Sequence, residues 1–143
     1  MDRPEQAVEI FNQGYNCAQS VVIAHADMLG LPEDEAAALA AGFGAGMGKV
    51  QTVCGAVSGA IIVIGSSLYR DRDRDKTKEL IYDKVNEFIV KFRGRFESLE
   101  CMDLTGIDIS TEEGMEKAER EGIFRDRCEN YVSESCRILE EIL

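Results

Sequence analysis

Residues 50–69, VQTVCGAVSGAIIVIGSSLY, carry no charged side chain and are long enough to cross a lipid bilayer. Three glycines and several hydroxyl side chains interrupt the stretch, and it stands alone in an acidic protein. These features favour a buried helix over a membrane span. Thr52 is a plausible N-cap for a helix over residues 53–69, and a helix that is apolar on all sides belongs at the centre of a bundle. The run IIVI also fits a buried strand, although the length of the stretch favours a helix.

Apolar residues elsewhere recur mostly at helical spacing, which predicts further helices around the central one. Pro4 suits a helix start, and Gly14 and Gly30 suit helix ends. The predicted helices cover residues 4–13, 16–30, 32–41, 53–69, a stripe over 80–92, a short segment after Ser110 or Thr111, and 124–143. The sequence therefore predicts an all-α bundle of about six or seven helices in a single domain over residues 1–143.

Composition limits the classes of function. The chain of 143 residues has 27 acidic and 16 basic side chains and a net charge of −11, which repels nucleic-acid phosphates. A nucleic-acid partner is therefore not expected. The opening residues MDRPEQAVEIF lack the basic and apolar segments of a signal peptide, so we expect a cytoplasmic protein.

The five cysteines are the most informative side chains for function. Because the cytoplasm keeps thiols reduced, redox, catalytic or metal-binding roles are more plausible than a disulfide framework. Cys17 follows Asn16, and Cys54 follows Thr52 by two residues, so each lies in the first turn of a predicted helix. A helix N-terminus stabilises a thiolate, so we expect a lowered pKa and readiness to attack a disulfide or bind a metal.

Glycines gather near Cys54. Residues 42–48 read GFGAGMG, which predicts an irregular loop with Gly44, Gly46 and Gly48 shaping the mouth of a site near Cys54. The loop lacks the spacing and the terminal Lys-Ser/Thr pair of a P-loop. Gly55 and Gly59 leave room for a close approach by a substrate, a cluster, a second cysteine or a neighbouring helix.

The remaining cysteines carry weaker local signals. Cys101, Cys128 and Cys136 form no CxxC pair, which argues against a zinc ribbon or a thioredoxin motif. The single histidine, His25, lies within a predicted helix among Ala and Asp and is expected to be structural or exposed.

Several segments together carry a family resemblance. GYNCAQSV, GFGAGMG, VCGAVSGA, ECMDLTGIDI and FRDRCENYV resemble the redox-active proteins named for the C_GCAxxG_C_C pattern, over about residues 5–135. The resemblance implies that Cys17, Cys54, Cys101 and Cys128 are the characteristic cysteines and leaves Cys136 outside the pattern. The family name carries adjacent small-residue and Cys positions, whereas Val53 precedes Cys54 here and CGAVSG supplies the motif.

Three functions are open at this point. The first is thiol–disulfide or electron-transfer chemistry with a redox partner protein or a small thiol or disulfide, which would make the protein an oxidoreductase. The second is an iron–sulfur cluster or another thiolate-bound metal held by Cys17, Cys54, Cys101 and Cys128. The third is a non-enzymatic helical module that binds a partner or forms a homodimer.

Overall fold

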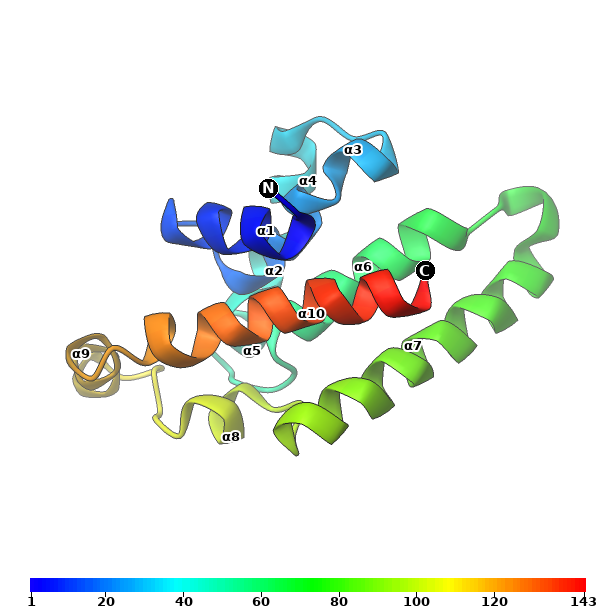
Figure 1. Cartoon of the computed structure of the whole chain (residues 1–143). Coiled ribbons are helices and arrows are strands. Elements are labelled where there is room, and N and C mark those ends of the chain that lie inside the picture. Colours follow the sequence, from blue (N-terminus) through cyan, green and yellow to red (C-terminus); the bar gives the residue numbers. More distant parts are fainter.

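Helix α6 (Gly55–Leu68) runs through the middle of the protein in the computed structural model, which describes residues 1–143 (Figure 1). Eight of its 14 residues are buried. It packs against α2 (Cys17–Ala24), α7 (Arg74–Phe96) and α10 (Glu129–Ile142). The buried central helix and the all-α fold class predicted from the sequence are confirmed, although the helix begins two residues later than expected.

Two further N-terminal helices form an outer layer over α2 and α10. α1 (Arg3–Asn12) packs on α2 and α10, and α4 (Glu33–Ala40) packs on α2. α7 runs back along α6 as the other arm of a hairpin, whose tip projects beyond the other helices (Figure 1). Seven α-helices have eight or more residues, in agreement with the predicted number.

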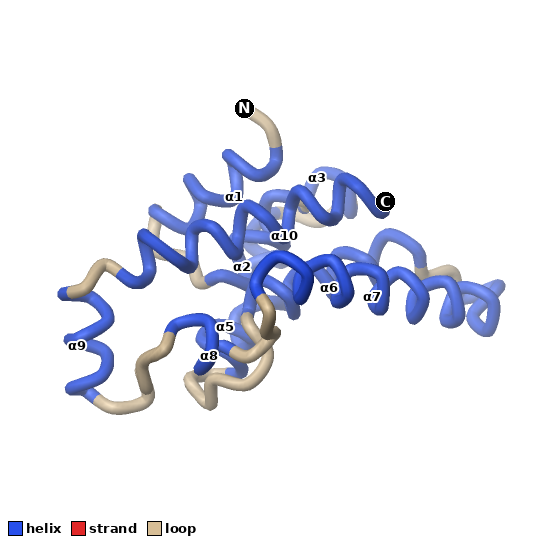
Figure 2. Tube along the Cα trace, turned by 60° about the horizontal axis from the view of Figure 1, so that its bottom comes forward, coloured by secondary structure: helices blue, strands red, loops and turns tan.

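The short elements lie mainly at one end of the bundle. There α5 and α8 lie side by side in both views (Figures 1 and 2). The remaining helices and turns are α3 (Ala26–Leu29), the 3-10 turns η1 (Ala41–Phe43) and η2 (Asp71–Asp73), α5 (Gly44–Met47), α8 (Cys101–Thr105), α9 (Glu112–Arg120) and the π-helical turn η3 (Phe124–Cys128).

Two boundaries differ from the sequence prediction. The expected helix over residues 16–30 is broken at His25, whose backbone leaves helical geometry between α2 and α3. The helix predicted from the apolar stripe over 80–92 is longer than expected: α7 already begins at Arg74, within the charged run 70–78. Its polar side chains stay exposed while the helix forms, because only one face of α7 has to pack.

Aromatic side chains fill the contact between α7 and α10. Phe92 and Phe96 lie with ring centroids 4.8 Å apart, and Phe96 meets Tyr131 edge to face at the same distance. Phe88 and Phe92 are completely buried. None of the helices has both the length and the apolar character that a bilayer crossing requires.

Candidate functional site

The GFGAGMG segment folds into a left-handed turn. From Ala45 to Lys49 every residue has a positive φ, including the non-glycine residues Ala45, Met47 and Lys49. The turn is closed by backbone hydrogen bonds from Gly48 to Gly44 and from Lys49 to Ala45. A left-handed conformation costs a non-glycine residue roughly 1 to 2 kcal/mol. The expected irregular loop is therefore an ordered turn, and strained backbone of this kind is concentrated at functional sites.

Cys17 is the first residue of α2 and keeps partial contact with solvent. Asn16 caps the helix as expected: its side chain accepts a hydrogen bond from the Gln19 N–H at 2.9 Å, and the Gln19 side chain accepts from the Asn16 N–H. The backbone N–H of Ala45, in the left-handed turn, faces the Cys17 sulfur and favours its thiolate. The turn and the helix start thus converge on one sulfur.

Cys54, and not Thr52, is the N-cap residue of α6. The Thr52 hydroxyl instead donates a hydrogen bond to the Gly46 carbonyl at 3.1 Å. The helix starts later because residues 52–54 pair with residues 99–101, a contact between distant segments that local sequence signals do not reveal. Thr52 therefore anchors the left-handed turn and does not cap the central helix.

This pairing brings Cys54 and Cys101 together. Val53 and Glu100 form an antiparallel bridge, with hydrogen bonds of 2.7 Å from the Cys54 N–H to the Leu99 carbonyl and from the Cys101 N–H to the Thr52 carbonyl. Side chains alternate along extended backbone, so Cys54 and Cys101 share the face opposite Val53 and Glu100. Cys101 is also the first residue of α8.

Cys128 reaches the site from the π-helical turn that precedes α10. Two hydrogen bonds tie this region to α8: Arg127 donates to the Thr105 carbonyl at 3.0 Å, and the Tyr131 hydroxyl donates to the Leu104 carbonyl at 2.7 Å. π-helical turns occur often at functional sites. The two bonds hold Cys128 and Cys101 on neighbouring elements.

The four thiols are close enough to influence one another's ionisation. A Cys17 thiolate raises the pKa of Cys54, Cys101 and Cys128, and a Cys101 thiolate also raises the pKa of Cys54 and Cys128. We name this group, Cys17, Cys54, Cys101 and Cys128, the four-cysteine pocket. Cys17 alone is partly exposed, whereas the other three are buried, with exposed fractions of 5 to 7%.

Burial affects the pKa values of the thiols more strongly than the helix N-termini do. The expectation of lowered thiol pKa values is wrong, because burial raises the pKa of Cys17 even though backbone N–H groups oppose it. Burial, followed by the charge of a Cys17 thiolate, raises the pKa of Cys101 to about 11 and places that of Cys54 well above its usual value. Backbone N–H groups of the left-handed turn and of the start of α2 partly offset this burial at Cys17.

Four of the predicted glycines are sites of close approach. A Cβ atom on Gly46 would lie 2.7 Å from the Cys101 Cβ, and one on Gly59 would lie 2.8 Å from the Ala18 carbonyl oxygen. Gly44 faces the Asn16 side chain, and a Cβ on Gly55 would lie 3.4 Å from the Cys17 Cβ. By contrast, Gly48 has a positive φ, but a Cβ there would make only an ordinary contact with the Gly42 carbonyl oxygen. The groups that come close to these glycines are thus cysteine side chains and the neighbouring helix α2.

Gln51 is a residue of the site that the sequence analysis missed. Its side chain is 3% exposed, and its amide contacts the sulfur of Cys101 and the backbone that follows α8. A single glutamine within an uncharged stretch gives no local signal for such a role. Only its position three residues before Cys54 hinted that it belongs to the site.

Cys136 lies apart from this group. It is completely buried in α10, and the charged groups that affect its pKa are Glu140, Arg3, Arg137 and Asp2, with no cysteine among them. His25 is buried as well, and its Nδ1 lies 2.7 Å from the Val21 carbonyl oxygen, which fits the structural role expected for it.

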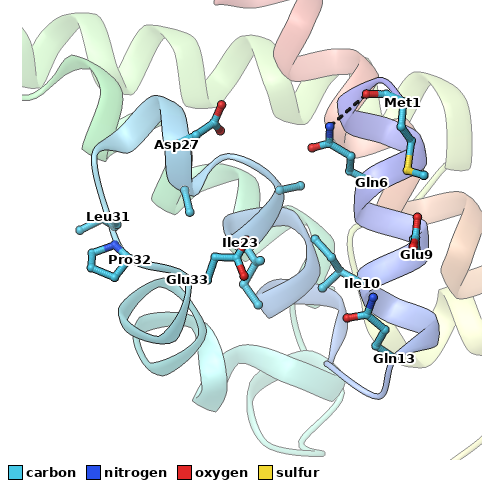
Figure 3. A pocket seen from close by; sticks show the side chains of 12 residues that line it. Met1, Gln6, Glu9, Ile10, Gln13, Ile23, Asp27, Leu31, Pro32 and Glu33 are labelled. Atoms are coloured by element: carbon cyan, nitrogen blue, oxygen red, sulfur yellow. Dashed lines mark hydrogen bonds between the residues drawn. The ribbon is translucent and has the colours of Figure 1, made fainter.

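A cavity of about 490 Å³ lies between α1, the α2–α3 segment and the start of α4 (Figure 3). Ile10 and Ile23 contribute apolar surface to it, and Glu9 and Glu33 contribute carboxylates. None of the five cysteines lines this cavity, so it is separate from the four-cysteine pocket.

The four-cysteine pocket contains the four sulfur donors that a thiolate-bound cluster needs. N–H groups of Ala45 and Gln51 lie beside the sulfurs of Cys17 and Cys101. In the present side-chain arrangement, however, no three Cys, His, Asp or Glu side chains converge closely enough to hold a metal ion. Binding a metal therefore requires these side chains to rearrange.

Comparison with known proteins gives one match. Residues 15–142 match the family model described as "Putative redox-active protein (C_GCAxxG_C_C)". Neither the curated proteins nor the solved structures contain a match to this chain.

Proposed function

We propose, from the premise that this chain belongs to the C_GCAxxG_C_C redox-active family, that the four-cysteine pocket performs thiol–disulfide exchange with Cys17 as the accessible, attacking thiol. The observation that carries the proposal is one partly exposed cysteine residue within electrostatic reach of three buried thiols. Thiol–disulfide exchange needs two different sulfurs. The first must be accessible to the partner disulfide, and the second must lie close to the first so that it can attack the mixed disulfide.

The reaction has two balanced steps. The Cys17 thiolate attacks one sulfur of a partner disulfide, forms a mixed disulfide and releases the other partner sulfur as a thiolate, which takes up a proton. A buried thiol of the pocket then loses its proton and attacks the Cys17 sulfur, forming an internal disulfide and releasing the first partner sulfur. Two protein thiols are oxidised and the partner disulfide is reduced.

Raised thiol pKa values slow the reaction at neutral pH but do not prevent it. Only the thiolate attacks, so a higher pKa lowers the reactive fraction while making each thiolate a better nucleophile. The Ala45 N–H and the start of α2 partly offset the burial of Cys17. We therefore expect the rate to rise with pH through the alkaline range.

Reaction with oxidised glutathione tests this proposal. Reduced wild-type protein, Cys17→Ala and Cys136→Ala are incubated with it, and intact mass is followed with time. We expect the wild type and Cys136→Ala to pass through a mixed disulfide and then lose two hydrogens, while Cys17→Ala does neither. Equal reaction of Cys17→Ala and the wild type would contradict the role of Cys17.

A second candidate function is an iron–sulfur cluster, which the four thiols and the N–H groups around them favour. Cys17, Cys54, Cys101 and Cys128 would hold the cluster, and a bound cluster would supply one-electron transfer. Reconstitution with iron and sulfide under anaerobic conditions tests it. Cluster binding predicts stoichiometric iron in the wild type and Cys136→Ala but not in Cys128→Ala, whereas iron-free wild-type protein would contradict this candidate.

Other expectations from the sequence remain predictions. These are the cytoplasmic location, the homodimer, the non-enzymatic binding role, and the identity of a partner protein or small thiol.

A further inference from the structure

Gln51 occupies a special position beside Cys101. Its side chain is buried and its backbone has a positive φ of 61°, which is uncommon for a non-glycine residue. Its Nε2 donates to the Ile107 carbonyl at 2.8 Å and to the Thr105 hydroxyl at 3.3 Å, and lies 3.9 Å from the Cys101 sulfur. Its Oε1 accepts from the Ile109 N–H at 2.8 Å.

We propose that Gln51 is a positioning residue that makes Cys101 the thiol that resolves the mixed disulfide at Cys17. The inference rests on the proposed thiol–disulfide exchange and adds which buried thiol completes it. The Gln51 amide has two N–H bonds, which serve the Ile107 carbonyl and the Thr105 hydroxyl, and it turns one of them to the thiolate that forms at the neighbouring Cys101 sulfur. A hydrogen bond to an ionised sulfur is stronger than one to a neutral thiol, so the contact tightens when Cys101 loses its proton.

The left-handed turn places Cys101 beside Cys17. The Ala45 N–H faces the Cys17 sulfur, and a Cβ on the next residue, Gly46, would lie 2.7 Å from the Cys101 Cβ. The two cysteines thus meet consecutive residues of one turn. The same turn is fixed to Gln51 by a backbone hydrogen bond from the Gln51 N–H to the Ala45 carbonyl.

The other two buried thiols of the pocket, Cys54 and Cys128, have no comparable side-chain contact at their sulfurs. No side-chain amide contacts the sulfur of Cys54 or Cys128, and Arg127, the cation that affects Cys128, donates its hydrogen bond to the Thr105 carbonyl. Cys101 is therefore the one buried thiol of the pocket with a side-chain amide beside its sulfur.

In the resolving step the Cys101 thiol gives its proton to solvent, and the thiolate attacks the Cys17 sulfur of the mixed disulfide. A bond forms between the sulfurs of Cys17 and Cys101 while the bond from Cys17 to the partner sulfur breaks. The partner leaves as a thiolate and takes up a proton. Gln51 exchanges no atoms in this step and acts only through the position and ionisation of Cys101.

The first experiment maps the internal disulfide of wild-type protein after reaction with oxidised glutathione, by peptide mass spectrometry. We expect a link between Cys17 and Cys101. A link from Cys17 to Cys54 or Cys128 would overturn the inference and leave the proposed function intact. Absence of any internal disulfide would overturn the proposed function itself.

The second experiment compares Gln51→Glu with Thr105→Val. Gln51→Glu keeps the oxygen that accepts from Ile109 but removes the N–H donors and adds negative charge. Thr105→Val removes a hydroxyl from the same network without touching the donor to sulfur. The rate of Cys101 alkylation is measured against pH, with Cys136 in the same sample as the reference.

We expect the Cys101 midpoint to rise by about one pH unit in Gln51→Glu and resolution at pH 8 to slow roughly tenfold, because one pKa unit is a tenfold change in thiolate. Thr105→Val should keep the wild-type midpoint. A merely structural role would disturb both variants alike and move the Cys136 rate with them. An unchanged Cys101 midpoint in Gln51→Glu, or equal shifts in the two variants, would overturn the role of Gln51.

Discussion

The four-cysteine pocket and the site of Cys136 both contain buried thiols, but the groups that surround these thiols differ. Cys128 and Cys136 are eight residues apart near the end of the chain, and both are buried. Burial raises the pKa of both thiols, to about 12 in the case of Cys136. Cys128, however, is influenced by two other cysteines, whereas Cys136 is influenced only by carboxylates and guanidinium groups. A buried thiol with a raised pKa is therefore not enough to distinguish the proposed redox site, and the neighbouring sulfurs are what distinguish it.

The largest expected effect comes from breaking the close contact between the left-handed turn and Cys101. In Gly46→Ala a non-glycine residue has to adopt a positive φ, and its Cβ overlaps the Cys101 Cβ and the backbone of Gln51. We expect a loss of about 3 kcal/mol in the free energy of unfolding, measured with urea, and rapid alkylation of Cys101 in the folded protein.

Gly48→Ala is the matched control for this change. Gly48 also has a positive φ, but a Cβ there would meet only the Gly42 carbonyl oxygen, at 3.9 Å. Its cost should be about 1 kcal/mol, from backbone conformation alone. Equal losses in the two variants would show that the contact with Cys101 has no energetic role. Alkylation of Cys136 should stay slow in both variants.

The next effect concerns the contact between the helices that carry Cys17 and Cys54. Gly59→Ala places a Cβ 2.8 Å from the Ala18 carbonyl oxygen and pushes α2 away from α6. We expect a loss of about 2 kcal/mol by urea unfolding and slower formation of the internal disulfide. On the same helix, Gly65→Ala meets no neighbour and should stabilise the protein by up to about 1 kcal/mol. Destabilisation by Gly65→Ala as large as that by Gly59→Ala would refute this explanation.

Stability at alkaline pH tests the raised thiol pKa values, which the four-cysteine pocket and Cys136 have in common. A thiol whose pKa is higher in the folded protein stabilises it fully below the unfolded pKa, near 9, and this stability is lost as the pH rises toward the folded value. The free energy of unfolding in reductant should therefore fall between pH 9 and 11, by at most about 1.4 kcal/mol per unit for each buried thiol. Both Cys136→Ala and Cys101→Ala should reduce this slope. A slope unchanged in both variants would contradict the raised pKa values.

The smallest effect concerns the bond between α8 and α10. Tyr131→Phe removes the hydrogen bond to the Leu104 carbonyl and should cost about 1 kcal/mol by urea unfolding. Alkylation of Cys101 and Cys128 should become faster, while that of Cys136 is unchanged. Tyr82→Phe is the control, because Tyr82 is 59% exposed and lies on the surface. Faster alkylation of Cys136 in Tyr131→Phe would indicate general loosening of the fold.

The sequence predicts those features that depend on local patterns. The uncharged stretch predicts the central helix, and Asn16 correctly marks the start of α2 at Cys17. The glycine run predicts unusual backbone, although Ala45, Met47 and Lys49 enter the left-handed region as well. Local patterns such as these determine helix caps and periodicity, and they suffice for the fold class.

Long-range contacts explain what the sequence does not predict. The bridge between Val53 and Glu100 displaces the helix start from Thr52 to Cys54 and brings Cys101 to the site. The contacts of the Gln51 side chain join residues that are 50 to 58 positions apart. The sign of the pKa shifts also depends on burial, which is a property of the packed chain and not of a helix N-terminus alone.

The most direct test of the central claim is linkage mapping of the wild-type protein after limited oxidation, carried out once in the folded state and once in urea. We expect the folded protein to form a disulfide between Cys17 and another member of the four-cysteine pocket, while Cys136 remains a free thiol that is alkylated only after unfolding. In urea the pairing should lose this preference and include Cys136. A disulfide to Cys136 in the folded protein, or the same pairing in both states, would contradict the claim that neighbouring sulfurs create the redox site.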